Sequence, residues 1–514
     1  MSWEVVMKNK LLTALMVTLL VLQAVASLTF IADSQAQATP DVYVGIDLSY
    51  GDVAEVKAMI DQVSPYTNLV VIGTSKITWY PNKLTETFQY AYDKGLSFIS
   101  LTPALPETSI ESIPSKAQWF EYAKATWGNR LLGFYYMDEP GGKQLDRVQS
   151  WIPSNTTSSA STYAEAANQF TTSIGNNIDW ARKYTLNSSG YPLFTSDYAL
   201  YWFDYKAGYD TLFAELGWNY SRQLNIALCR GAATLQNKDW GAIITWTFTA
   251  PPYIESGEKL YYDMVLAYDN GAKYIVVFDG NEGWTGGILK QEHLEALQRF
   301  WNYAKNNPRK SSPVGDRTAY ALPKAYGFGF RGPEDHIWGL WEADSLSRNL
   351  SISVASLLYD YGEKLDIIYD DGLQPGNNYG YSQIVYWNSY EVPPPKISIL
   401  SPENTTYAVN NVTLALTVNK PATWIAYSLD GQEQTAITEN FTLSNLPDGS
   451  HDITFYAIDE FETMGTSETI HFNIETPKAF PVVPVAAVAV VAVVLVGAGF
   501  LIYRKKRKRQ AAVP

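Results

Sequence analysis

Short apolar runs and longer amphipathic stretches alternate along the first half of the chain. The short runs predict strands at residues 42–46, 69–72, 98–101 and 132–137. Behind each run, apolar residues recur at helical spacing, at 53–63, after Pro81, at 119–127 and at 163–184. Strand followed by helix, four times in succession, predicts a parallel α/β fold.

The second half continues this alternation. Strands are predicted at 193–195, 212–216, 242–248 and 274–278, with helices at 221–232 and 259–268 and an apolar helical face between Leu294 and Ala304. Eight strand-and-helix units of this size predict a (β/α)8 TIM barrel, which we assign to residues 39–307. A doubly wound parallel sheet is the structural alternative.

Residues 308–390 predict a small α/β cap subdomain, because a helix at 351–361 is followed by strands at 365–369 and 383–386. Three prolines at 393–395 then mark a stiff boundary. Beyond them, short alternating segments separated by Asp430-Gly431 and Asp448-Gly449 predict an immunoglobulin-type (Ig-like) β-sandwich over residues 396–476.

Three segments of this last region resemble the Ig-like repeats of archaeal cell-surface proteins. They are Ser-Pro-Glu-Asn-Thr-Thr-Tyr at 401–407, Ala-Tyr-Ser-Leu-Asp-Gly at 426–431 and Leu-Pro-Asp-Gly-Ser-His-Asp at 446–452. The resemblance covers the sandwich alone. It implies a spacer or an adhesive module and no catalysis.

Hydrophobic segments of a different kind lie near both ends. Lys8 and Lys10 precede an apolar run at 11–26, and small residues follow in Ala36-Gln-Ala38, so residues 1–38 are predicted to be a signal peptide. An uncleaved N-terminal anchor is the alternative. Residues 479–503 are uncharged and long enough for one transmembrane helix. The basic residues at 504–509 then predict a single-pass protein of the cell membrane, with a cytoplasmic tail at 504–514 and residues 39–478 outside the cell.

Composition narrows the classes of ligand. The net charge of −14 disfavours nucleic acid as a partner, while the aromatic content of 14% suits a cleft that stacks sugar rings. Cys229 is the only cysteine, so no disulfide framework exists, and we expect it on a buried helix face. Seven Asn-x-Ser/Thr sequons are consistent with a glycoprotein. The oligomeric state cannot be predicted from these features.

The candidate chemistry begins at Gly133-Phe-Tyr-Tyr-Met-Asp-Glu-Pro140, an apolar strand that ends at two adjacent carboxylates. In a barrel, side chains at the carboxyl ends of the strands converge on one mouth. This segment resembles the fourth strand of several glycoside-hydrolase-like (β/α)8 proteins, although the largest such clan has Asn where this chain has Asp138. The resemblance implies that Glu139 is a general acid/base and that the ligand is a polysaccharide or a glycoprotein glycan.

We therefore predict Glu139, Glu282 and Asp138 as catalytic residues, with Glu282 as nucleophile or base. Asp279, Glu215 and Asp197 are the alternatives for that second role. The residues predicted to bind substrate are Asp47, Trp79, Tyr136, Asp197, Glu215, Trp246, Asp279 and Trp284.

Other interpretations account for the same residues. The acids could instead bond to loop backbone, Asp279, Asn281 and Glu282 could hold Ca²⁺, and Trp246 and Trp284 could belong to the core. No cofactor and no metal are predicted. The leading hypothesis is a membrane-anchored, extracellular glycoside-hydrolase-like protein. The alternative is a non-catalytic carbohydrate-binding or structural protein of the cell surface.

Overall fold

The computed structural model describes residues 41–111, 113–147, 159–309, 313–438 and 441–478, together with positions 496, 498, 499, 502 and 504. The chain divides into two compact units, Met1–Glu391 and Val392–Pro514. The predicted signal peptide at 1–38 lies outside the described residues, and so do the span at 479–503 and the tail at 504–514 apart from those isolated positions. Within the described ranges, no helix has the length and apolar character needed to cross a membrane.

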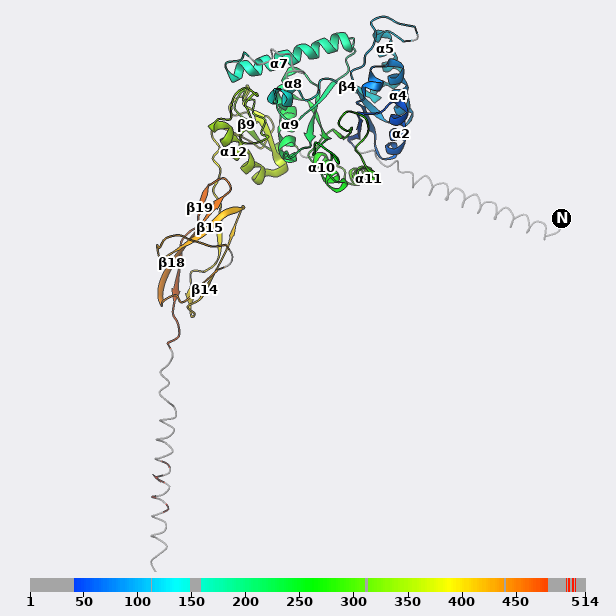
Figure 1. The fold of residues 1–514 in the computed structure, drawn as a ribbon. Helices are drawn as coiled ribbons and strands as arrows, with labels where there is room; N and C mark the ends of the chain where they lie inside the picture. Colours follow the sequence, from blue (N-terminus) through cyan, green and yellow to red (C-terminus); the bar gives the residue numbers. More distant parts are fainter. Residues whose placement is uncertain are drawn as a thin grey trace, which may run out of the picture. The chain divides into compact units, whose positions relative to one another are not determined.

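Eight parallel strands close into a barrel in the first unit, each paired with its neighbours in chain order and β8 paired with β1 (Figure 1). Closure excludes the doubly wound alternative. The strands are β1 (Tyr43–Leu48), β2 (Leu69–Ile72), β3 (Ser97–Leu101), β4 (Leu131–Tyr135), β5 (Leu193–Asp197), β6 (Thr211–Leu216), β7 (Asp239–Ile244) and β8 (Tyr274–Asp279).

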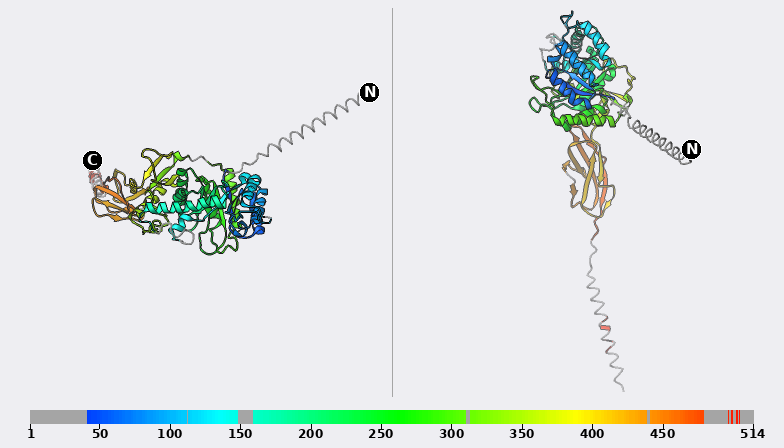
Figure 2. Two further views of the ribbon diagram at one scale, coloured as in Figure 1. Left: turned by 90° about the horizontal axis from the view of Figure 1, so that it is seen from above. Right: turned by 90° about the vertical axis from the view of Figure 1, so that its right-hand side faces the viewer.

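Helices connect the strands and surround the barrel (Figure 2). Several begin at a side chain that accepts an N–H of the first turn, such as Asp52, Ser115 and Ser221. Cys229 is buried within α9, as predicted. The helices are α2 (Val53–Val63), α3 (Ser75–Thr78), α4 (Pro81–Asp93), α5 (Lys116–Trp127), α6 (Pro140–Leu145), α7 (Tyr163–Trp180), α8 (Tyr201–Ala207), α9 (Arg222–Gln236), α10 (Gly257–Asp269) and α11 (Gln291–Asn306).

Alternate side chains of each strand enter two separate cores. One set fills the barrel interior and includes Val71, Ile99, Phe213 and Val276. The other set faces the surrounding helices and joins the larger core. Because successive strand residues point to opposite faces, position within a strand decides which side chains enter the barrel.

A three-stranded parallel sheet with the order β10-β9-β11 forms the centre of the cap. Its elements are β9 (Thr318–Leu322), α12 (Ser345–Tyr361), β10 (Leu365–Tyr369) and β11 (Gln383–Tyr386). The central strand β9 was not predicted from the sequence, because Thr-Ala-Tyr-Ala-Leu is short and alanine has little strand preference. The helix predicted at 351–361 starts six residues after the true beginning of α12, at Ser351 rather than Ser345.

A buried ion network joins the cap to the barrel helix α9. Arg230 Nε donates to Asp366 Oδ1 at 2.6 Å, and Arg317 Nη1 donates to Asp366 Oδ2 at 2.7 Å. Arg230 Nη2 also donates to the carbonyls of Glu363 and Leu365. The carboxylate is fully buried, so both of its oxygens depend on these guanidinium groups.

The second unit contains two β-sheets around one apolar core. A three-stranded sheet has the order β12-β14-β17, and the other has the order β13-β20-β18-β15-β16 with β19 on β18. Residues of both sheets, such as Leu414 and Phe455, share the core. The strands are β12 (Ile397–Ser401), β13 (Thr406–Tyr407), β14 (Val412–Val418), β15 (Ala422–Leu429), β16 (Thr435–Ala436), β17 (Phe441–Leu443), β18 (Gly449–Asp459), β19 (Met464–Thr466) and β20 (Ile470–Ile474). Its assignment to the Ig-like type stays a prediction.

Candidate active site

In three strands, a polar side chain near the carboxyl end points to the inside of the barrel, at its mouth. In β6, Glu215 comes two residues after Phe213, which lies in the interior core. Ser196 comes two residues after Phe194 in β5. Asp47 comes four residues after Tyr43 in β1 and therefore points to the same, interior side of the strand. All three are buried near the carboxyl ends of their strands, where the mouth of a barrel collects functional groups.

The end of β4 adds two acids through an unusual backbone path. Met137 and Glu139 both have φ near 52°, the left-handed conformation that such residues seldom adopt. The turn is secured by the Thr195 hydroxyl, which donates to the Met137 carbonyl, and by the Glu139 N–H, which donates to the Ser196 carbonyl at 3.1 Å. Strain held in place by neighbouring bonds is typical of functional sites.

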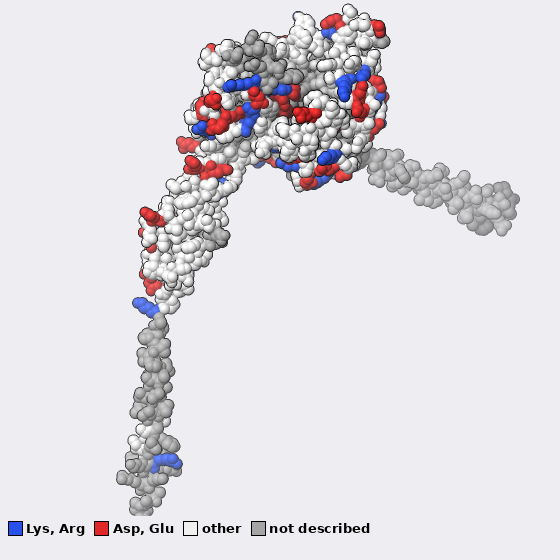
Figure 3. All heavy atoms as spheres, viewed as in Figure 1, with Lys and Arg blue, Asp and Glu red and all other residues white. Residues whose placement is uncertain are grey.

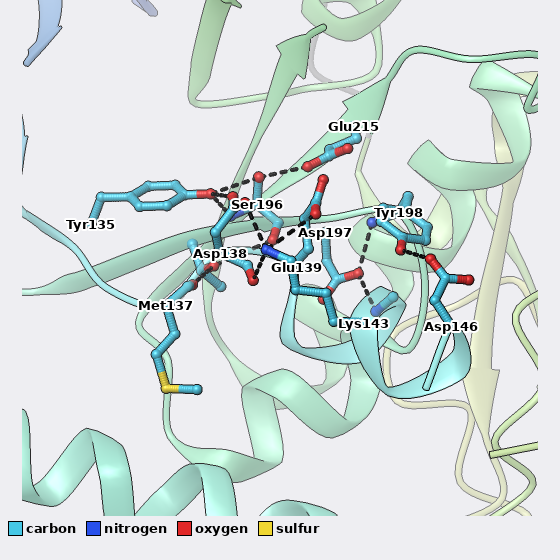
Figure 4. Close-up of polar contacts among 12 residues, drawn as sticks. Tyr135, Met137, Asp138, Glu139, Lys143, Asp146, Ser196, Asp197, Tyr198 and Glu215 are labelled. Atoms are coloured by element: carbon cyan, nitrogen blue, oxygen red, sulfur yellow. Dashed lines mark hydrogen bonds and ion pairs between the residues drawn. The ribbon is translucent and has the colours of Figure 1, made fainter. Parts of the chain in front are cut away.

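Asp138, Glu139 and Glu215 meet at this point, with one oxygen of each lying within 4.8 Å of the other two. Tyr135 Oη donates to Asp138 Oδ1 at 2.6 Å, and Ser196 Oγ donates to Glu215 Oε1 at 2.7 Å. The two hydroxyl oxygens lie 2.7 Å apart, and Figure 4 shows the resulting chain of contacts. A polar network therefore links the ends of β4, β5 and β6.

Lys143 supplies positive charge to the cluster from the first turns of α6. Its Nζ lies 2.9 Å from Asp138 Oδ2 and 3.3 Å from Glu139 Oε2. The oxygen spacing alone would suit a divalent cation. Because an ammonium group already lies among these carboxylates, the cluster has a cationic partner without a metal.

Burial raises the pKa of Glu139 to about 7, and the negative charge of Asp138 adds to the rise while Lys143 opposes it. The pKa of Glu215 lies well above its usual range because the side chain is buried beside Glu139 and Asp138. Two neighbouring carboxyl groups with raised pKa values share protons rather than ionise together. Such a pair can provide one acid and one base at neutral pH.

Asp197 points away from the interior and holds the turn that carries Glu139. Its carboxylate accepts the N–H groups of Gly141 at 2.6 Å and Gly142 at 2.8 Å, which are otherwise unpaired at the start of α6. A Cβ at Gly142 would come within 2.1 Å of the Tyr198 ring, so this close approach requires glycine. Burial raises the pKa of Asp197 to about 6.

Asp279, at the end of β8, likewise points away from the barrel interior. Its Oδ1 accepts the N–H groups of Ile288 at 2.6 Å and Leu289 at 3.1 Å. Asn281 bonds within the same loop, to Thr285 and Gly286. The structure thus gives both residues a loop-holding role, and they do not join a three-acid cluster in the described part of the chain.

The predicted aromatic residues differ in accessibility. Trp284 is 52% exposed and Trp79 is 64% exposed, whereas Trp246 is half-buried with its Nε1 donating to the Gly280 carbonyl at 2.9 Å. Tyr136 is half-buried and packs against the large core. Trp79 and Trp284 therefore present open rings, and Trp246 lies beneath Trp284.

Of the three residues predicted as catalytic, Asp138 and Glu139 lie together and Glu282 lies apart. Glu282 is exposed on the loop after β8 and is outside the carboxylate cluster. Tyr135, Ser196 and Lys143 were not among the site residues predicted from the sequence. Ser196 could have been found because it lies two residues after Phe194 in β5 and so points to the same side of the strand. Lys143 could have been found from its position four residues after Glu139 on a helix.

No family model and no curated protein matches the chain. A β-glucosidase from Exiguobacterium marinum is 9% identical and has a TM-score of 0.18, with 68% of this chain and 88% of that chain covered. A rice β-glucosidase is 8% identical, with 69% and 90% covered and a TM-score of 0.19.

A third similar structure, thiamine phosphate pyrophosphorylase from Pyrococcus furiosus, is 10% identical, with 52% of this chain and 97% of that chain covered and a TM-score of 0.27. Likeness at these TM-scores carries no argument about activity. The barrel is defined by its strand pairing.

Proposed function

We propose that this chain hydrolyses glycosidic bonds at the barrel mouth, with Glu139 and Glu215 as the catalytic pair. The observation that carries the proposal is the close approach of two carboxyl groups with raised pKa values at the ends of β4 and β6. Glycoside hydrolysis needs one protonated and one ionised carboxyl group on either side of the scissile bond. Exposed aromatic rings near the mouth suit the apolar faces of sugars.

The surroundings of the two glutamates assign their roles. Lys143 lies 3.3 Å from Glu139 and favours its ionised form. Glu215 is deeply buried and has its pKa raised further, so it retains the shared proton. We therefore assign Glu139 as nucleophile and Glu215 as acid/base, which reverses the role that the sequence resemblance implied for Glu139.

In the first step, the Glu139 carboxylate attacks the anomeric carbon while the bond to the leaving oxygen breaks and Glu215 transfers its proton to that oxygen. In the second step, Glu215 takes a proton from water, and the resulting hydroxide displaces Glu139 from the anomeric carbon. Retaining enzymes separate their carboxyl groups by about 5 to 5.5 Å, and inverting enzymes by about 6.5 to 9.5 Å. Oxygens within 4.8 Å favour retention.

A carbohydrate-binding protein without catalysis is the second candidate. The observation that favours it is the extensive bonding of the acids to their surroundings, including Lys143 on Asp138 and Ser196 on Glu215. Such a protein would bind glycans and release no sugar.

We infer from the sequence that the chain is anchored by residues 479–503 in the cell membrane, with the barrel outside the cell acting on polysaccharide or glycoprotein glycan. The sandwich would be an Ig-like spacer. Acidic and basic side chains are interspersed on the visible face of the larger unit, without a continuous basic patch (Figure 3).

The test is release of reducing sugar from a panel of polysaccharides by the full chain. We expect Glu139→Gln and Glu215→Gln each to lower the rate about 1,000-fold while remaining at least as stable as the wild type in thermal unfolding. The matched control is Glu282→Gln, the exposed acid outside the cluster, which should retain the wild-type rate. Binding without release of sugar by the wild-type chain would favour the second candidate.

A further inference from the structure

We propose that the barrel mouth binds an extended glycan, with one sugar ring stacked on Trp284 at a subsite away from the bond that is cleaved. This inference rests on the proposed function and adds the substrate class, an oligosaccharide or polysaccharide chain rather than a single terminal sugar.

Trp284 presents an open ring on a stack of other aromatic rings. Its ring centroid lies 6.3 Å from that of Trp246 with an interplanar angle of 21°, and Phe278 meets it edge-on at 6.0 Å. Trp246 is fixed from below by its bond to the Gly280 carbonyl. Trp246 is half-buried and Trp284 is 52% exposed, so the outer face of the Trp284 ring is available to a ligand.

The loop that carries Trp284 is rigid and strained. Asn281 Oδ1 accepts the N–H groups of Thr285 at 2.9 Å and Gly286 at 3.1 Å, and the Trp284 N–H donates to the Asn281 carbonyl at 3.0 Å. Trp284 itself has φ of 59°, which is unfavourable for a bulky residue. The bonds of Asn281 hold this conformation, so the exposed ring keeps one position, as a ligand platform requires.

Polar side chains continue from this platform to the acid pair. A Cβ placed on Gly280 would lie 3.1 Å from Ser49 and 3.3 Å from Trp284, so both side chains lie beside Gly280. Ser49 Oγ donates to Asp47 Oδ1 at 3.0 Å, and Asp138 is close enough to Asp47 to raise its pKa. Ser49 and Asp47 are both buried, so buried polar side chains connect the neighbourhood of Trp284 to the acids.

The barrel order places Trp284 and Glu139 on opposite sides of the mouth. Trp284 follows β8 and Glu139 follows β4, which are separated by three strands in either direction around the closed barrel. We infer from this order that a sugar held between Glu139 and Glu215 and a sugar stacked on Trp284 are different rings of one ligand. Alternating apolar ring faces and hydroxyl groups along a glycan match an aromatic platform followed by polar groups.

The test measures dissociation constants by calorimetry for cello-, manno- and chito-oligosaccharides from disaccharide to hexasaccharide, using the full chain with Glu139→Gln to prevent cleavage. We expect affinity for one series to rise with length. Adding Trp284→Ala should then weaken binding of the longest members about tenfold and leave the shortest unchanged. Trp284→Phe should restore most of the loss.

Trp180→Ala is the matched control, because Trp180 is an equally exposed tryptophan on α7. Trp180→Ala should leave the dissociation constants of both short and long oligosaccharides unchanged. Equal weakening of all lengths by Trp284→Ala, no weakening at all, or no binding of any series would overturn the subsite. If the wild-type chain releases no sugar while the length-dependent loss is observed, hydrolysis fails and the subsite stands. If sugar is released but Trp284→Ala binds normally, the subsite fails and hydrolysis stands.

Discussion

The carboxylate of Asp197 accepts the backbone N–H of Gly141 at 2.6 Å, and this bond ties the end of β5 to the helix that begins directly after Glu139. Asp197 also accepts N–H groups from Gly142, Tyr198 and Ala199. In the proposed mechanism Asp197 touches no reacting atom. It is a positioning residue that sets the direction of the left-handed turn at Glu139.

Replacing Asp197 tests this positioning role. Asp197→Ala leaves the first N–H groups of α6 buried without an acceptor, so we expect the free energy of unfolding to fall by about 3 kcal/mol. Asp197→Asn keeps one acceptor oxygen, so its free energy of unfolding, measured by denaturant, should fall less than that of Asp197→Ala. Asp179→Asn, at an exposed position of α7, is the control. Equal stability of Asp197→Ala and the control would contradict the role.

The pH dependence of the rate tests the charge on Glu139. Lys143 lowers the pKa of Glu139, so Lys143→Met should raise that pKa further above its value of about 7. If Glu139 must be ionised, the acidic limb of the kcat/KM profile will move to higher pH. Lys124→Met, an exposed change on α5, should leave the profile unchanged. Movement of the alkaline limb instead would show that Glu139 is the acid.

The sequence contained enough information to predict the barrel, because its strands and helices alternate with clear and distinct periods. It also contained an unused signal for the second carboxylate. Successive strand residues point to opposite sides, so Glu215 lies on the same interior side as Phe213, two residues earlier. By the same alternation, Asp197 and Asp279 point outward, where they bond to loop backbone. The prediction of Glu282 rested on its place after the last strand, and the structure leaves this residue exposed and outside the cluster.

The orientation of Asp138 and Glu139 could not be derived in the same way. Both follow the end of β4, where Met137 and Glu139 adopt left-handed backbone and the strand alternation no longer applies. That conformation depends on bonds from Thr195 and Ser196, nearly 60 residues later in the chain. Tertiary contacts of this kind leave no local pattern in the sequence.

The network between cap and barrel gives a stability prediction. Asp366→Ala would leave the buried guanidinium groups of Arg230 and Arg317 without their carboxylate, and we expect a loss of about 3 to 5 kcal/mol in the free energy of unfolding. Asp239→Ala removes an exposed partner of Lys273 and should cost less than about 1 kcal/mol. Similar losses in the two variants under urea denaturation would contradict the importance of the buried network.

Asp47 gives a prediction about pH and stability. Burial raises its pKa from 3.8 to about 7. The folded state therefore keeps a proton that the unfolded state releases near its normal pKa, and this contribution to stability falls as pH rises between these two values. Asp47→Asn should remove that dependence and make the chain more stable than wild type at pH 8, on the order of a few kcal/mol.

Thermal unfolding of wild type and Asp47→Asn at pH 5 and pH 8 checks this sign. The difference between the two proteins should be larger at pH 8 than at pH 5. Ser109→Ala, on an exposed loop, is a control for the buffers. A variant that is less stable than wild type at pH 8 would show that the ionised carboxylate of Asp47 is needed in the folded state.

The most direct measurement of the central claim is the anomeric configuration of the products, followed by proton NMR during hydrolysis of the responsive glycan by the full chain. The account predicts retention by wild type, and a glycosyl azide of opposite configuration when azide replaces the missing carboxylate in Glu139→Ala. Azide added to Glu215→Ala should instead give the retained configuration. Absence of any released sugar, inversion by wild type, or exchange of the two azide products would contradict a retaining mechanism with Glu139 as nucleophile and Glu215 as acid/base.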